Sequence, residues 1–237
     1  MRITLVNPNT SRAMTAKIAA AAREVAGPEV EVVAVCPDEG RGAIESHVDE
    51  AFAAVAVVEL IERDLADGGS DAYVIACFGD PGLDAARELT EAPVVGIAEA
   101  AMHVASISGR HFGVVTTLAR TLGRARDLVS RYGMTRACVS LGASGIPVLD
   151  LEDTTSESFE VIAGRCLEAV ERDGADAIVL GCAGMADLCH ALAGRVGVPV
   201  VDGVAAAVGI AAGMARMAVG TSKRDEYAPP PHRGLLV

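Results

Sequence analysis

The stretch "DAYVIACFGDPG", residues 71–82, joins a short apolar run to a cysteine and glycines, and the chain contains a second version of it. The second version is "DAIVLGCAGM", residues 176–185, in which Cys182 follows Cys77 by about 105 residues. An apolar run of strand length that ends at turn residues is typical of a strand buried in a parallel sheet. The repeat therefore predicts two related strand ends, each followed by a Cys-x-Gly turn.

The similarity between the two halves of the chain extends outward from these strand ends. Residues 69–72, "GSDA", match 174–177, "GADA", and "PVVGIAEAA" from Pro93 matches "PVVDGVAAA" from Pro199. The offset between matching residues stays near 105 to 109 throughout. A repeat of this length indicates a duplicated domain, because solenoid units are much shorter.

Strand-length apolar runs alternate with Ala-rich segments of helical spacing along both halves. This alternation predicts parallel sheets with helices on both faces. We expect an α/β fold of two pseudo-symmetric doubly wound domains, each with a four-stranded parallel sheet flanked by helices. The first domain is predicted to be discontinuous, with residues 1–98 and 204–237, and the second to span 99–203. The expected strands are 3–6, 30–35, 72–76 and 93–97, then 112–115, 137–141, 177–181 and 199–201.

Polar turns follow the first strand of each half, with Asn7 and Asn9 in "NPNTS" and Thr116 and Thr117 in "TTLART". Ligands of open parallel sheets bind outside the carboxyl ends of the strands, where these turns and both Cys-x-Gly motifs lie. If the two domains face each other, the two cysteines approach one cleft from opposite sides. The polar turns are interpreted equally well as turns with helix caps or as ligand-binding groups.

Composition and charge limit the classes of function. The 237 residues are 51% hydrophobic but only 3% aromatic, which suits a core of Ala, Val, Leu and Ile between helices and sheets. The formal charge of -12 repels a phosphate backbone, so no nucleic-acid partner is expected. The first apolar run is too short for a secretory signal, and no run reaches the roughly 18 to 20 apolar residues of a membrane span. We expect a cytoplasmic protein without a membrane partner.

Neither the cysteines nor the histidines, His232 among them, have the spacing of a metal site. The sequence also lacks a phosphate-binding loop, so we expect no metal and no organic cofactor. His103 is interpreted as a structural residue, and Glu45 and Ser46 as a plain loop beside the cleft. The cysteines of a cytoplasmic chain are expected to be reduced. Four of the six are interpreted as small core residues: Cys36, Cys138, Cys166 and Cys189.

Cys77 and Cys182 suit proton exchange on both faces of one carbon. A thiol at a strand-to-helix turn can be present as thiol or as thiolate near neutral pH. One thiolate removes a proton from an acidic carbon, and the other thiol returns a proton to the opposite face. The carbanion needs a partner for its charge, and the backbone N–H groups at Gly79 and Gly184 are expected to supply it.

Together with "LVNPNTS", "AIESHVDEA" and "PVVGIAEAA", the two cysteine motifs resemble the Asp/Glu/hydantoin racemase superfamily and, within it, the hydantoin racemases. The resemblance covers nearly the whole chain. It implies a cofactor-independent racemase in which Cys77 and Cys182 are the catalytic acid and base, and it implies a homo-oligomer. The predicted substrate-binding residues are those that match ring-contacting positions of the family, with Asn7 and the two motif glycines added: Asn7, Asn9, Ile44, Phe78, Gly79, Thr116, Thr117, Ala183 and Gly184.

The residues after the first cysteine favour one substrate class within the superfamily. Phe78 and Gly79 stand where free amino-acid racemases have Asn-Thr for the substrate carboxylate. An apolar ring there suits a neutral cyclic ureide better than a zwitterion. We therefore expect interconversion of D and L 5-monosubstituted hydantoins. An allantoin racemase is the first alternative, and a non-catalytic doubly wound binding protein is the second. The tail from Thr221 is expected to be an extended arm, a subunit contact or partly disordered.

Overall fold

The computed structural model describes residues 1–151 and 155–231. His232 and the last five residues of the tail lie outside this part. The first half contains β1 (Arg2–Val6), α1 (Arg12–Ala26), β2 (Glu31–Val35), α2 (His47–Ala66), β3 (Ala72–Ile75), α3 (Leu83–Leu89), β4 (Val94–Gly96) and α4 (Ile97–Ser108). The second half contains β5 (Phe112–Thr116), η1 (Ala119–Thr121), α5 (Leu122–Arg131), β6 (Cys138–Ala143), η2 (Leu149–Leu151), α6 (Ser156–Glu171), β7 (Ala177–Gly181), η3 (Ala183–Leu188), α7 (Cys189–Val196), β8 (Val200–Val201), α8 (Gly203–Arg216) and η4 (Asp225–Tyr227).

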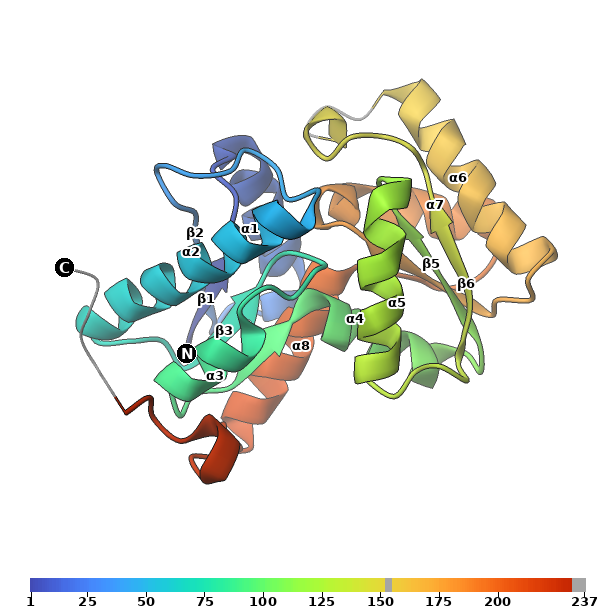
Figure 1. Cartoon of the computed structure of the whole chain (residues 1–237). Coiled ribbons are helices and arrows are strands. Elements are labelled where there is room, and N and C mark those ends of the chain that lie inside the picture. The colour runs from blue at the N-terminus through green and yellow to red at the C-terminus, as the bar shows by residue number, and fades with distance from the viewer. Residues whose placement is uncertain (152–154, 232–237) are drawn as a thin grey trace.

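The eight strands form two parallel sheets of the same topology. The first sheet has the order β2-β1-β3-β4 and the second the order β6-β5-β7-β8, so each strand has a counterpart in the other half. All strand pairs are parallel. Figure 1 shows the two sheets side by side with helices around each. The predicted fold class is confirmed, and every expected strand is present within one or two residues of its predicted ends.

Short local signals begin the helices that follow the strands. Ser11 starts α1 by accepting a hydrogen bond from Met14 N, and Ser46 starts α2 in the same way through Asp49 N. The carboxylate of Asp202 accepts from Val204 N and Ala205 N at the start of α8. These caps satisfy N–H groups that have no partner within the helix. Each helix therefore begins just beyond the carboxyl end of a strand or its loop.

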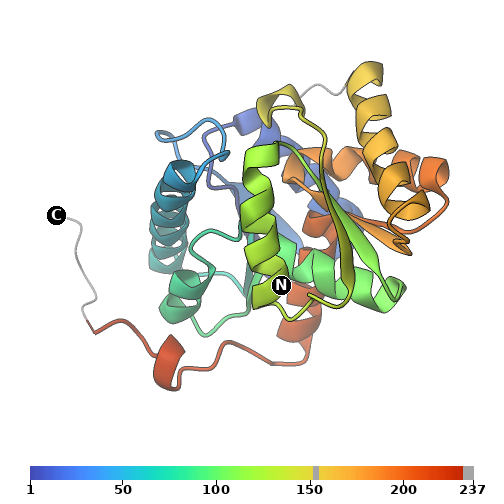
Figure 2. The same cartoon turned by 45° about the vertical axis from the view of Figure 1, so that its right-hand side comes forward.

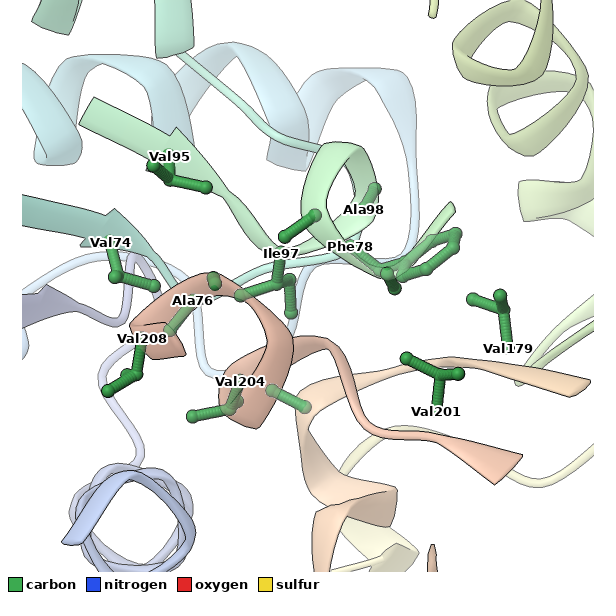
Figure 3. Packing of buried hydrophobic residues seen from close by; sticks show 14 of the residues in the cluster. Val74, Ala76, Phe78, Val95, Ile97, Ala98, Val179, Val201, Val204 and Val208 are labelled. Carbon is green, nitrogen blue, oxygen red and sulfur yellow. The ribbon is translucent and has the colours of Figure 1, made fainter. Parts of the chain in front are cut away.

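One hydrophobic cluster joins the two halves. It includes Val74 of β3 and Val179 of β7, and it continues through Ile97 of α4 and Val204 of α8 (Figure 3). Helix α8 packs on α1, α4 and β3, so the chain returns to the first half after β8. Helix α4 packs on α8 and also on β7 and β8, at the junction of the halves. The domain boundaries at residues 98 and 203 stay a prediction.

The described part of the tail packs on the first half. Thr221 N donates to Glu91 O at 2.8 Å, and Tyr227 Oη donates to Asp84 Oδ1 at 3.1 Å. Figure 2 shows this arm running beneath the first half. Residues 221–231 thus form an extended arm on their own chain. Within the described ranges, none of the helices combines the length and hydropathy that a membrane crossing needs.

The four cysteines outside the Cys-x-Gly motifs differ in burial. Cys166 is fully buried in the core of the second half. Cys138 and Cys189 are partly buried and pack against hydrophobic clusters. Cys36, at the end of β2, is also partly buried. The interpretation as core residues holds fully for Cys166 and partly for the others.

Candidate active site

A single pocket opens at the carboxyl ends of both sheets and takes its walls from both halves. It is lined by ten of the eleven residues that the sequence predicted for the site: Asn9, Ile44, Cys77, Phe78, Gly79, Thr116, Thr117, Cys182, Ala183 and Gly184. Asn7 is the predicted residue that does not line it. The thiol from β3 and the thiol from β7 therefore reach one cavity from different halves of the chain.

Hydrogen bonds hold the turn that carries Cys77. Asp80 N donates to Cys77 O at 2.9 Å, and Asp80 has a positive φ of 46°. The buried Asp80 carboxylate accepts from Ala98 N at 3.1 Å, from Glu99 N at 2.9 Å and from Tyr132 Oη at 2.6 Å. Two of these donors are at the start of α4, and the third is at the end of α5 in the second half. The Cys77 turn is thus attached both to the junction helix and to the opposite half.

Apolar packing holds the turn that carries Cys182. Met185 N donates to Cys182 O at 3.1 Å, which matches the hydrogen bond that closes the first turn. Met185 occupies the position equivalent to Asp80 and is completely buried in the core of the second half. Gly181, just before the cysteine, accepts a hydrogen bond from Thr116 Oγ1 at 3.1 Å. The two turns have the same backbone bond but different anchors.

The glycine of each motif has two physical roles. The backbone N–H groups of Gly79 and Gly184 lower the pKa of the Cys77 and Cys182 thiols and so favour the thiolates. A Cβ on Gly184 would lie 2.9 Å from Met14 Cε, and a Cβ on Gly79 would lie 3.2 Å from a carboxylate oxygen of Glu50. Side chains from other elements therefore occupy the space beside both motifs. That the same N–H groups hold the charge of the substrate carbanion stays a prediction.

Asn7 supports Asn9 from behind the pocket. Asn7 is 1% exposed, and its Nδ2 donates to Asn9 Oδ1 and to Thr15 Oγ1, both at 2.9 Å. Ser11 N also donates to Asn9 Oδ1, at 2.9 Å. These bonds engage the oxygen of the Asn9 amide, and Asn9 lines the pocket. Across the pocket, Thr116 and Thr117 are nearly buried but still line the wall.

Phe78 contributes less surface to the pocket than its position in the sequence suggested. It is 8% exposed and belongs to the cluster that joins the halves, together with Ala98 and Val201 (Figure 3). Most of its ring is therefore part of the core. Ile44, which is half-buried, supplies more of the accessible apolar wall, and Val148 from the second half also lines the pocket.

Comparison with known proteins identifies the family. The model of the family described as "Asp/Glu/Hydantoin racemase" matches residues 3–211. A hydantoin racemase of Rhizobium meliloti is 44% identical over 97% of this chain and 95% of its own length. A hydantoin racemase of Paenarthrobacter aurescens is 40% identical over the whole of both chains. The structure of an allantoin racemase from Klebsiella pneumoniae is 49% identical, with a TM-score of 0.96 over 100% of this chain and 96% of that one.

The chain belongs to the Asp/Glu/hydantoin racemase family. It is therefore an isomerase, a racemase of this family, rather than the non-catalytic binding protein that the sequence analysis left open. The resemblance inferred from the two cysteine motifs is confirmed.

Burial raises the pKa of both thiols in the racemase pocket. It raises the pKa of Cys77 to about 12, and the acidic groups of Cys182, Asp80 and Glu50 act in the same direction. Burial raises the pKa of Cys182 to about 11; Glu45 adds to this effect and Lys17 opposes it. Both groups are therefore mainly thiols at neutral pH, and Cys182 is the one that ionises at lower pH.

Several residues of the racemase pocket had no signal in the sequence. Met14, Glu50, Thr121, Arg124 and Val148 all line the cavity. They lie on helix faces or in loops whose local sequence is ordinary, and they reach the cavity because the two halves meet there. Glu45, which the sequence placed in a loop beside the cleft, accepts a hydrogen bond from Val148 N at 2.7 Å across the two halves. Glu45 lies in a loop, as expected, and this bond connects the loop to the second half.

The histidines in the described part of the racemase are dispersed. His103 has a 2.7 Å hydrogen bond between its Nδ1 and Glu99 O one turn earlier in α4, and His47 lies 3.6 Å from Glu50 at the start of α2. No cluster of three or more potential metal ligands occurs within residues 1–151 and 155–231.

Proposed function

We propose that this racemase interconverts the D and L enantiomers of 5-monosubstituted hydantoins without a cofactor, by proton transfer at C5 between Cys77 and Cys182. The observation that carries the proposal is the position of the two thiols in one pocket, each supplied by the equivalent strand of a different half. A group on each side of a carbon is what inversion by proton transfer requires.

The reaction needs one thiolate and one thiol at the start. The thiolate sulfur takes the C5 proton, and the electron pair of the broken C–H bond moves into the ring to give an enolate on the adjacent carbonyl oxygen. The second thiol then gives its proton to the opposite face of C5 and becomes the thiolate. Atoms and charge balance, and the two cysteines exchange protonation states in each turnover. The reverse enantiomer uses the same groups in the opposite roles.

The polar wall suits the amide edges of a cyclic ureide. Asn9 Oδ1 is occupied by Asn7 and Ser11, while its Nδ2 has no hydrogen-bond partner among the described residues and can donate to a ring carbonyl. Thr116 and Thr117 face the same cavity. Hydroxyl and amide groups can pair with both the N–H and the C=O of a neutral ring. The apolar surface of Ile44 and Val148 suits an apolar substituent at C5.

Allantoin, a hydantoin with a polar ureido substituent, is the second candidate substrate. It is favoured by the 49% identity to the allantoin racemase from Klebsiella pneumoniae. The charged side chains of Glu50 and Arg124 also line the pocket and could pair with the N–H and C=O groups of a ureido group. The apolar wall and this charged wall make opposite predictions about the better substrate.

A polarimetric screen tests the proposal. Pure protein is incubated with single enantiomers of 5-benzylhydantoin, 5-isobutylhydantoin, allantoin, aspartate and glutamate. We expect the rotation of both alkyl hydantoins to decay to zero without loss of substrate, and kcat/KM to be higher for them than for allantoin. A tenfold preference for allantoin would establish the second candidate. Racemisation of aspartate or glutamate with no effect on any hydantoin would exclude both.

The remaining expectations about the enzyme are open to simple measurements. We expect activity to survive exhaustive dialysis against a chelator and to be protected by a reducing agent, because thiolates facing one cavity are open to oxidation. Homo-oligomeric assembly and a cytoplasmic location stay predictions, which light scattering and cell fractionation can test.

A further inference from the structure

Two equivalent helices reach across the boundary between the halves. Helix α1 follows β1, and helix α5 follows β5, the strands that hold equivalent places in the two sheets. Figures 1 and 2 both show α5 at the boundary, between the second sheet and the helices of the first half. Helix α1 in turn packs on η3, the segment directly after Cys182. Each helix therefore belongs to one half and touches the cysteine region of the other.

Arg124 of α5 binds the turn that carries Cys77. Its Nε and Nη2 both donate to Gly79 O, at 3.1 Å and 2.5 Å. Its Nε also lies 3.5 Å from a carboxylate oxygen of Glu50, which packs against the same glycine. The guanidinium thus bridges α5, α2 and the Cys-x-Gly turn of the first half. Both charged side chains are about three-quarters buried.

Lys17 of α1 binds the segment that follows Cys182. Its Nζ donates to Leu151 O at 2.6 Å and to Asp187 Oδ2 at 3.0 Å. Asp187 is in η3, and Leu151 packs against Gly184 of the second motif. The pattern repeats that of Arg124: a cation from one half binds a backbone carbonyl and a carboxylate beside the cysteine turn of the other half.

We propose that Arg124 and Lys17 are reciprocal positioning residues, each fixing the cysteine turn of the opposite half: Arg124 that of Cys77, and Lys17 that of Cys182. This inference rests on the proposed two-thiol proton transfer. Neither cation needs to touch the substrate. Each acts by holding a sulfur atom at the distance and angle from C5 that proton transfer requires.

Such positioning has a large effect on rate because proton transfer occurs only within hydrogen-bond distance. A displacement of about 1 Å of a reacting group can cost about 100-fold. Gly79 connects Arg124 to Cys77, since its C=O accepts both hydrogen bonds from Arg124 and its N–H lowers the pKa of the Cys77 thiol. Loss of the guanidinium would free the carbonyl and let the thiol shift within the turn.

Ordinary racemisation rates cannot separate the two effects. Enantiomers have equal free energy, so kcat/KM is the same in both directions whichever thiol is impaired. Exchange of the C5 proton for deuterium does separate them. In a Cys182→Ser background the exchange depends on Cys77 alone, and in a Cys77→Ser background on Cys182 alone.

The test is a crossed set of variants measured by proton NMR in deuterium oxide. Arg124→Gln and Lys17→Gln are each introduced into both single-cysteine backgrounds, and the exchange of each 5-benzylhydantoin enantiomer is followed. We expect Arg124→Gln to slow the Cys77 exchange at least about tenfold and to change the Cys182 exchange less than about threefold. Lys17→Gln should have the reverse pattern. Arg124→Lys, which can restore one of the two bonds to Gly79 O, should recover part of the loss.

Matched controls remove a cation from the exposed face of the same helices. Arg126→Gln in α5 and Arg23→Gln in α1 change the net charge equally and should leave both exchange rates unchanged. Thermal melting of every variant identifies those that fail to fold. If a glutamine variant fails to fold, Arg124→Lys or Lys17→Arg is measured in its place.

The outcomes separate this inference from the proposed function. If neither single-cysteine background exchanges one enantiomer selectively, the two-thiol mechanism itself is wrong. A second result would contradict only the reciprocal positioning. The two backgrounds would exchange opposite enantiomers, but each cation variant would slow both exchanges equally or would slow neither. The cations would then be only structural.

Discussion

The two cysteine turns share a backbone bond and a strand position, yet three residues after the cysteine one has a buried carboxylate and the other a buried methionine. Asp80 attaches its turn through hydrogen bonds to α4 and to Tyr132, whereas Met185 attaches its turn through packing in the second core. Hydrogen bonds specify direction, and packing specifies volume. The difference indicates that what both turns need is a fixed position for the cysteine. Either hydrogen bonds or packing can hold that position.

The turns also differ in their electrostatic surroundings. The charged neighbours that most affect the pKa of Cys77 are acidic, whereas Cys182 has Lys17 as well as Glu45. The same reaction is thus assigned to two thiols of unequal acidity. Cys182 is expected to carry the thiolate more often before the substrate binds.

Removal of either thiol should have the largest effect on racemase activity. Cys77→Ser and Cys182→Ser should each lower racemisation by about 100-fold or more, the usual contribution of a positioned acid or base. Each variant should still exchange the C5 proton of one enantiomer with retention, and the two variants should choose opposite enantiomers. Cys36→Ser, outside the pocket, serves as the control. Exchange of the same enantiomer by both variants would contradict the assignment of one face to each cysteine.

The unequal acidity predicts a difference in alkylation. The thiolate is the reactive form, so the rate of modification by iodoacetamide rises with pH as the thiol loses its proton. Racemase activity should also rise with pH, because the reaction needs one thiolate. With pKa values of about 12 and about 11, Cys182 should react faster than Cys77. A difference of one pKa unit corresponds to about a tenfold difference in thiolate fraction. Peptide mass spectrometry between pH 7 and 9 measures each site; faster reaction at Cys77 would reverse the assigned order.

The space beside the glycines predicts a smaller, unequal effect on stability. Gly184→Ala places a methyl group 2.9 Å from Met14 Cε and 3.1 Å from Leu151 Cβ. Gly79→Ala meets chiefly the movable end of Glu50 at 3.2 Å. We expect Gly184→Ala to lower the free energy of unfolding by about 2 to 3 kcal/mol, within the usual cost of overpacking, and Gly79→Ala by less. Urea denaturation measures both, and equal losses would mean that Met14 and Leu151 move aside easily.

The smallest effect is expected at the hydrogen bond between the Cys77 turn and the second half. Tyr132→Phe removes a donor from Asp80, which keeps two backbone N–H donors. A loss of about 1 kcal/mol in unfolding free energy is expected from one hydrogen bond. Tyr227→Phe, which removes the 3.1 Å bond to Asp84, is the matched control and should cost less because Asp84 is about half exposed. Equal losses would show that burial of Asp80 does not strengthen its bond.

The sequence by itself determined the sheets and the pocket residues at the ends of the strands. Apolar runs of strand length and their repeat at a constant offset specify two equal parallel sheets, because strand patterning depends on neighbours along the chain. The carboxyl ends of parallel strands gather at one edge, so residues such as Cys77, Cys182 and Thr116 could be assigned to a common cavity without knowledge of the packing.

Only the tertiary structure decided which other side chains surround these strand ends. Arg124 and Glu50 reach the pocket from helix faces, and Lys17 reaches the segment after Cys182 in the same way; their approach depends on how one half is oriented against the other. Asn7 supports Asn9, and Phe78 is largely part of the core. Elements far away in the sequence cover these two turns, so local sequence could not show which side chains are buried. Local patterns specify which strand end a residue occupies, whereas contacts across the cleft arise from residues far apart in the chain and leave no periodic signal.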